Sequence, residues 1–102
     1  MAKGYWIARI DVHNMDGYKE YIAQNGVVFA KYGAKFLVRG GTHEVKEGTA
    51  RSRNVVLEFR DYETALACYN SPEYTHLVKV RSPHSEGDLV IIEGWEGAQP
   101  GA

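Results

Sequence analysis

The sequence has a single cysteine, almost no net charge and no long apolar run. Cys68 cannot form a disulfide within the chain, and so low a cysteine content is typical of proteins from a reducing cytosol. Twelve basic and 13 acidic side chains leave a formal net charge of −1, which gives no electrostatic case for binding nucleic acid or an anionic membrane. No apolar run approaches the roughly 18 residues of a membrane span. A strand pattern that begins directly after the N-terminus leaves no room for a signal peptide, so we expect a cytoplasmic protein.

What the sequence does contain is enough for one hydrophobic core. Its 102 residues are 44% hydrophobic and 25% charged, which are ordinary values for a globular protein and argue against disorder. We expect a single domain over residues 1–95, followed by a flexible tail over residues 96–102.

Two segments alternate between apolar and mixed side chains, the pattern of a half-buried strand. In residues 4–12 the apolar set is Trp6, Ala8, Ile10 and Val12, and the mixed set is Tyr5, Ile7, Arg9 and Asp11. In residues 54–59 one face carries Val55, Leu57 and Phe59, and the other carries Asn54, Val56 and Glu58. Because successive strand residues point to opposite faces, each strand should pack one face against an apolar layer. The mixed face suits a polar-lined cavity better than open water or dry core.

Apolar residues at helical spacing predict a helix over about residues 15–32, with Asn14 or Asp16 as its N-cap and Asn25 as the one polar residue of its stripe. A second helix should begin after a cap at Asp61 and break at Ser71–Pro72, where a short third helix begins. Strands are expected at residues 34–41 and 89–95, the last after a turn at residues 83–87. The order β-α-β-β-α-β predicts an α+β, ferredoxin-like fold with a four-stranded antiparallel sheet and the helices on one face.

The face of this sheet away from the helices should be strongly apolar. It would carry Ile7, Leu37 and Val56, with either Val90 and Ile92 or Leu89 and Ile91. An exposed patch of this size is unusual for a soluble monomer. A second copy that packs sheet to sheet is the simplest cover, because two-fold dimers are the commonest homo-oligomers. We therefore predict a homodimer through the sheet face, a dimeric α/β barrel.

The ordered set of motifs along the chain resembles the domain-of-unknown-function 1330 family of the dimeric α/β-barrel superfamily. The motifs are Gly4–Ile7, Arg39–Gly41, Glu47–Gly48, Arg53–Phe59, Ala67–Tyr69, Ser71–Tyr74, Arg81 and Glu93–Gly94. The sequence departs from the family pattern at Cys68, where the family often has tryptophan. The resemblance implies the fold more securely than an activity, because the wider superfamily includes cofactor-independent monooxygenases, lactone isomerases and haem-binding enzymes.

Arg39 and Glu58 are the pair most open to a role in a site. In regular strands, Phe36 and Val38 would share one face and Lys35, Leu37 and Arg39 the other, so that Arg39 and Glu58 both point away from the helices. A charge removed from water persists only when it is paired and hydrogen-bonded. The pair is therefore either a structural salt bridge or a ligand site in which Arg39 holds a carboxylate through its bidentate fork.

Further candidates for ligand contact are Tyr5, Arg9, Asn54, Tyr69, Tyr74 and Arg81, since pockets are commonly lined by aromatic side chains. Each also has a plainer interpretation, as a packing residue or a solvated charge. Arg53, like Arg9, is a weaker candidate, since either could simply be a solvated charge at a strand edge. His76 is a candidate base beside Tyr74, although a histidine on a short helix more often faces solvent. No HxxxH or CxxC spacing occurs, so we expect no metal site and no cofactor.

Two classes of function follow from these residues. The first is a cofactor-independent enzyme that acts on a small carboxylated or aromatic metabolite, with Arg39 as anion clamp and Glu58 or His76 handling a proton. The second is a non-catalytic binding module or a stress-associated dimer, whose barrel holds a small ligand. The sequence does not decide between an enzyme and a binding module.

Overall fold

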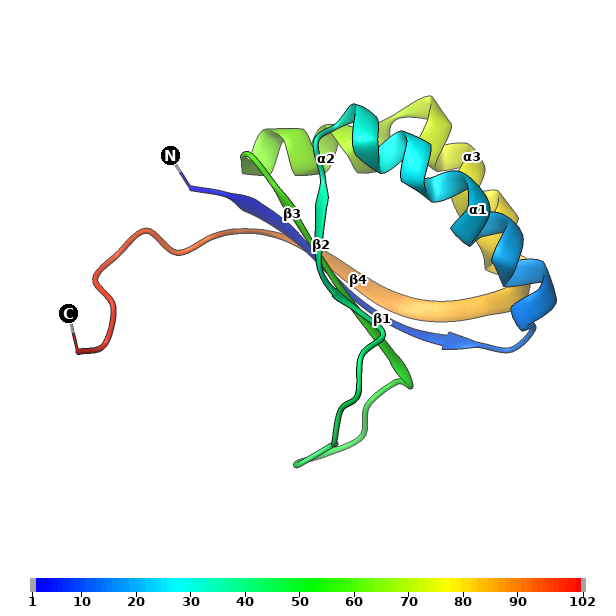
Figure 1. Ribbon diagram of the computed structural model, residues 1–102, viewed down its shortest axis with the longest axis horizontal. Coiled ribbons are helices and arrows are strands. Elements are labelled where there is room, and N and C mark those ends of the chain that lie inside the picture. Colours follow the sequence, from blue (N-terminus) through cyan, green and yellow to red (C-terminus); the bar gives the residue numbers. More distant parts are fainter. Residues whose placement is uncertain (1, 102) are drawn as a thin grey trace.

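The computed structural model describes residues 2–101 and contains one four-stranded antiparallel sheet with helices on one face (Figure 1). The elements in chain order are β1 (Gly4–Val12), α1 (Met15–Lys31), β2 (Lys35–Arg39), β3 (Arg53–Phe59), α2 (Tyr62–Asn70), α3 (Pro72–Arg81), a 3₁₀ turn (Ser82–His84) and β4 (Ser85–Glu93). The strand order in the sheet is β2-β3-β1-β4. The predicted α+β, ferredoxin-like fold is confirmed.

Side-chain caps set where the helices begin. Asn14 accepts a hydrogen bond from the backbone N–H of Gly17, and Asp61 accepts one from that of Thr64. Ser71 ends α2 and caps α3, whose first residue is a proline. Proline suits the first turn because its missing N–H would have no intrahelical partner there. The local chemistry therefore divides the helical region 62–81 into two helices, as its sequence predicts.

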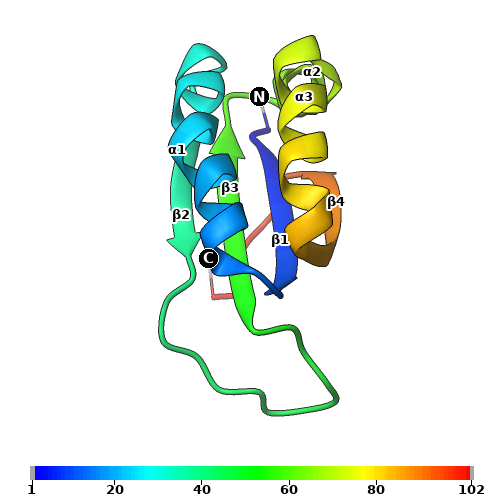
Figure 2. The same cartoon turned by 90° about the vertical axis from the view of Figure 1, so that its right-hand side faces the viewer.

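The register of the central pair separates the sheet into two faces. Trp6 lies opposite Leu57, and Tyr5 lies opposite Glu58. Because side chains alternate along a strand, the even residues of β1 and the odd residues of β3 point to the helices. The other set forms the helix-free face, which we call the open face; it lies behind the sheet in Figure 2, where the helices are in front of the strands. The two-faced pattern predicted for these strands is confirmed.

The core lies between the sheet and the three helices and is rich in aromatic rings. Trp6 is 2% exposed, and its indole N–H donates a hydrogen bond to the carbonyl of Ala65 in α2 at 2.9 Å. Its ring also makes an edge contact with Phe29 of α1 and with Tyr74 of α3, at centroid distances of 5.4 and 4.9 Å. A single residue of β1 therefore ties all three helices to the sheet, since edge contacts between rings add to the free energy of burial.

The open face exposes a row of large apolar side chains. Its exposed members are Ile7, Leu37, Val38, Val90 and Ile92, each between 39% and 54% exposed. Val90 and Ile92 pair with Ile7 and Tyr5 of β1, so of the two alternatives for β4 the set with Val90 and Ile92 lies on this face. Leu89 and Ile91 pack against the core instead.

Two sequence predictions are wrong in detail. β4 begins at Ser85, not at residue 89, and Gly87 lies inside the strand opposite Ile10 rather than in a turn. A β-carbon at Gly87 would come within 2.6 Å of the carbonyl oxygen of Arg9, so glycine at this position permits close approach to β1 and does not mark a turn. In β2 the register shifts between Phe36 and Val38, which reverses the face of every later residue of that strand.

Within residues 2–101, no helix has the length and hydropathy that crossing a bilayer requires.

Candidate functional site

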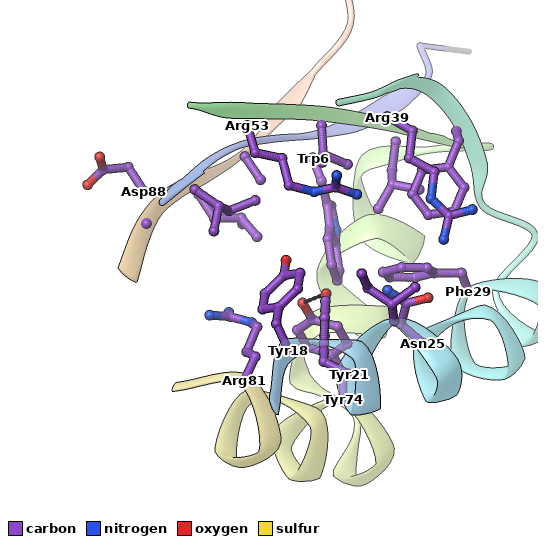
Figure 3. Close-up of a pocket in the computed structure, with 18 residues that line it drawn as sticks. Trp6, Tyr18, Tyr21, Asn25, Phe29, Arg39, Arg53, Tyr74, Arg81 and Asp88 are labelled. Atoms are coloured by element: carbon purple, nitrogen blue, oxygen red, sulfur yellow. Dashed lines mark hydrogen bonds between the residues drawn. The ribbon is translucent and has the colours of Figure 1, made fainter. Parts of the chain in front are cut away.

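The candidate site is a partly enclosed cavity of about 60 Å³ between the sheet and helices α1 and α3 (Figure 3). Its apolar walls come from the core, including Trp6, Phe29 and Phe36. Its polar side chains are Tyr18, Tyr21, Asn25, Arg39, Arg53, Tyr74 and Arg81. A buried water needs about 10–15 Å³ of such a cavity, so this one has room for about four to six water molecules or a ligand of that size. We call it the arginine cavity.

Three guanidinium groups reach the arginine cavity from different elements. Arg39 ends β2, Arg53 begins β3 and Arg81 ends α3. In the described part of the chain none of the three forms an ion pair with a carboxylate. Asp88 also borders the cavity, but its carboxylate points away from it and pairs with Arg51 at 2.9 Å (Figure 3). The cavity therefore carries positive charge that no carboxylate of residues 2–101 neutralises.

Arg39 reaches the arginine cavity because of the bulge in β2. Phe36 lies opposite Leu57 and Val38 opposite Val56, so Leu37 is the extra residue of the pair. The bulge turns Val38 to the open face and Arg39 to the helix side. There the Arg39 guanidinium lies 4.1 Å from the centroid of the Phe36 ring, a cation–π contact that positions it without neutralising it.

Gly40 allows Arg53 to reach the same cavity. Gly40 has a φ of +67°, in the left-handed region that glycine occupies without strain. A β-carbon at Gly40 would lie 2.6 Å from Nη1 of Arg53. The glycine that follows Arg39 therefore leaves room for the second guanidinium.

The tyrosines of the cavity are hydrogen-bond donors at neutral pH. The hydroxyl oxygens of Tyr21 and Tyr74 are 2.6 Å apart, with one donating to the other. Burial raises the pKa of both hydroxyls. The rise is large for Tyr21, whereas at Tyr74 the nearby Arg81 charge opposes it. Burial also raises the pKa of Tyr18, against the opposing charges of Arg53 and Arg81. All three hydroxyls therefore keep their protons.

Two buried polar atoms at the cavity have no hydrogen-bond partner. They are Nε of Arg53, a donor, and Oδ1 of Asn25, an acceptor. Asn25 is only 5% exposed. A buried polar atom without a partner costs free energy, and such atoms in a native structure call for an explanation. Chemically, the site combines many donors and three positive charges with a buried acceptor, Oδ1 of Asn25, that has no partner.

Comparison with known proteins identifies the family. The family model described as a domain of unknown function, DUF1330, matches residues 3–95. The chain belongs to the DUF1330 family. The resemblance found in the sequence motifs is thus confirmed, while the comparison with curated proteins gives no match.

Solved structures similar to this DUF1330 chain share its fold at low sequence identity. The protein of unknown function RPA0582 from Rhodopseudomonas palustris is 14% identical, with a TM-score of 0.74 over 94% of this chain and 85% of that one. SnoaB from Streptomyces nogalater, a cofactor-independent oxygenase, is 13% identical, with a TM-score of 0.64 over 98% and 99%. A dimeric ferredoxin-like protein of unknown function from Thermobifida fusca is 13% identical, with a TM-score of 0.62 over 90% and 91%. At these identities the likeness shows the fold alone.

In this DUF1330 chain, the site residues predicted from the sequence lie on two different faces of the sheet. Arg39, Tyr74 and Arg81 meet in the arginine cavity. Tyr5, Arg9, Asn54 and Glu58 lie on the open face, where the Tyr5 hydroxyl donates a hydrogen bond to Oε2 of Glu58 at 3.1 Å. This contact raises the pKa of Tyr5. The prediction that Arg39 and Glu58 share a face is wrong, because the β2 bulge sends them to opposite sides of the sheet.

The two remaining candidates lie outside the arginine cavity. His76 is exposed on α3. Tyr69 is half-buried, and its ring packs against Trp6 and Tyr74 at centroid distances of 5.7 and 5.4 Å, so it supports the wall from behind. In residues 2–101 no group of three histidine, cysteine, aspartate or glutamate side chains is placed to hold a metal ion.

Sequence reasoning missed three polar residues of the cavity as members of the site, Tyr18, Tyr21 and Asn25, and it gave Arg53 only as a weaker candidate. Of these, Asn25 did have a signal, since it was the one polar residue in the apolar stripe of its helix. Arg53 stands at the start of an apolar strand face, where a charge must have a reason to persist. The tyrosines had no such signal, because aromatic residues at helical spacing are ordinary core residues.

Proposed function

We propose that this protein binds a small organic carboxylate in the arginine cavity. The observation that carries the proposal is a set of three guanidiniums, free of carboxylate partners among residues 2–101, that border one cavity. Arginine binds carboxylates through two parallel hydrogen bonds, and such charge-assisted bonds are stronger than neutral ones. The buried and unpartnered Nε of Arg53 gives a bound carboxylate a donor that the protein leaves unused.

Binding is a better-supported function for this cavity than catalysis. Proton transfer needs a group with a pKa near the working pH within reach of the substrate. The tyrosines have raised pKa values and act as donors, and Asp88 is held by Arg51. Glu58 lies behind the sheet and His76 on the surface of α3, so neither is placed to take a proton from a ligand in the cavity.

The test is an NMR titration of ¹⁵N-labelled protein with propanoate, using propanamide and propylammonium at matched ionic strength as charge controls. We expect propanoate alone to shift the amide signals that surround the cavity. Arg53→Met should weaken propanoate binding by about tenfold or more, since bonds to charged groups contribute about 1.5–3 kcal/mol. Arg9→Met, which removes an arginine of the open face, is the matched control and should leave binding unchanged. Equal binding by Arg53→Met and the unmodified protein would show that the carboxylate is not held there.

We also propose that the protein works as a homodimer that covers its open face with a second copy. The five exposed apolar side chains of that face support this proposal, because a row of this kind is characteristic of an interface. The loop 40–52 extends on the side of the sheet away from the helices, beside the surface that a second sheet would contact (Figure 1). The Thermobifida fusca protein with the same fold is described as dimeric.

Sedimentation at micromolar concentration tests this assembly. The unmodified protein should sediment as a dimer, and Ile7→Glu, which adds a charge to the centre of the open face, should sediment as a monomer. Val27→Glu is the matched control, since Val27 is 78% exposed on α1 and lies away from the open face. A dimer that survives Ile7→Glu would place the interface elsewhere.

A further inference from the structure

The unpartnered Oδ1 of Asn25 in the arginine cavity indicates which class of carboxylate the cavity suits best. Asn25 belongs to α1, and its carboxamide lies beside Phe29 and Tyr21 on the helix side of the cavity (Figure 3). Arg39 and Arg53 extend from the sheet on the opposite side (Figure 3). A molecule between the two layers therefore meets donors from the sheet and an acceptor, Oδ1 of Asn25, from the helix.

We propose that the ligand is a short hydroxy acid, whose carboxylate binds the arginines of the sheet and whose hydroxyl donates a hydrogen bond to Oδ1 of Asn25. This inference rests on the proposed carboxylate binding and adds the second contact. A carboxylate alone has only acceptor atoms, so it leaves the Asn25 oxygen unsatisfied in a buried site. A hydroxyl supplies the missing donor.

Charge decides between a hydroxyl and an ammonium group as the donor. An ammonium group in the cavity would lie near three guanidiniums that no carboxylate of residues 2–101 neutralises, and like charges repel strongly where water is scarce. An amino acid is therefore excluded although it has both a carboxylate and a donor. A neutral hydroxyl meets the acceptor without this repulsion.

The volume of the cavity sets the length of the acid. About 60 Å³ holds about four to six water-sized groups, whereas a cavity that encloses benzene measures about 150 Å³. An aromatic acid is thus too large to lie within the cavity as it stands. A hydroxy acid with three or four carbon atoms fits, with its carbon chain against Trp6 and Phe36.

The experiment compares four acids of one length by the same NMR titration: propanoate, 2-hydroxypropanoate, 3-hydroxypropanoate and 3-aminopropanoate. At least one hydroxy acid should bind about three- to tenfold more tightly than propanoate, the gain expected for one hydrogen bond. The aminopropanoate should bind more weakly than propanoate. In Asn25→Leu, the hydroxy acids should lose their advantage while propanoate binds as before. Arg53→Met should weaken all of them.

The outcomes separate the two proposals. If propanoate and the hydroxy acids bind the unmodified protein equally, the acceptor has no role in recognition and the hydroxy-acid proposal is wrong, while carboxylate binding stands. If no acid binds, both proposals are wrong. The comparison on the unmodified protein decides the matter even if Asn25→Leu does not fold.

Discussion

The buried hydroxyl pair of Tyr21 and Tyr74 allows a quantitative test of the packing beside the cavity. The two side chains are 7% and 1% exposed, and their oxygens are 2.6 Å apart. Replacing either tyrosine with phenylalanine removes one hydroxyl and leaves the other without its partner in a buried place. A net hydrogen bond contributes about 0.5–1.5 kcal/mol, and an orphaned buried group costs about 1–3 kcal/mol. We therefore expect each single variant to lose about 1–2 kcal/mol of the free energy of unfolding.

The double variant should cost far less than the sum of the two single variants. Once both hydroxyls are absent, neither is left in a buried place without the other, and two phenylalanine rings fill nearly the same volume. We expect the double variant to be about as stable as either single one, which corresponds to a coupling energy of about 1 kcal/mol.

The assay is urea unfolding of the four proteins at one protein concentration, because the free energy of unfolding of the proposed dimer would depend on concentration. Tyr32→Phe serves as the control, since the Tyr32 hydroxyl makes no hydrogen bond within residues 2–101. It should change the free energy of unfolding by less than about 0.5 kcal/mol. Single losses that simply add in the double variant would refute the reasoning, because the two hydroxyls would then act independently.

Three further predictions concern backbone geometry and caps. Gly40→Ala forces a left-handed φ on alanine and should lower the free energy of unfolding by about 1–2 kcal/mol in urea, whereas Gly41→Ala, with open space and an ordinary φ, should change it little. Ser71→Ala removes the buried cap between α2 and α3 and should cost about 1 kcal/mol; an unchanged urea midpoint would show that the cap is dispensable. Hydrogen bonds from the first turn of α2 lower the pKa of Asp61, so its stabilisation is present above the ordinary carboxyl pKa and is lost as pH falls through the lowered value. The melting temperature should therefore fall less steeply from neutral to acid pH for Asp61→Asn than for the unmodified protein. Parallel declines would contradict this role.

Most of the fold could be predicted from the sequence because its determinants are local. Alternation assigned the faces of β1 and β3, and Asn14, Asp61 and Ser71 marked the helix ends through their own side-chain chemistry. These signals depend only on neighbouring residues. The start of β4 was missed for the opposite reason, since Gly87 is required by the approach of another strand.

The location of the site could not be predicted, because it depends on one irregular residue. Regular alternation in β2 places Arg39 beside Glu58, and nothing in the residues around Leu37 signals a bulge. The bulge is visible only when β2 is paired with β3. For this reason the sequence alone does not place Arg39 in the same cavity as Tyr74 and Arg81.

The order of strands has a consequence for how copies of this protein associate. β2 and β4 are the two edges of the sheet, and an unpaired edge can recruit a strand from another molecule. β2 is five residues long and irregular, so it offers a poor template. β4 is nine residues long but carries Glu86, Asp88 and Glu93, so two such edges would bring carboxylates together. Growth edge to edge into filaments is therefore disfavoured on both sides, which leaves the open face as the surface for the homodimer that we propose.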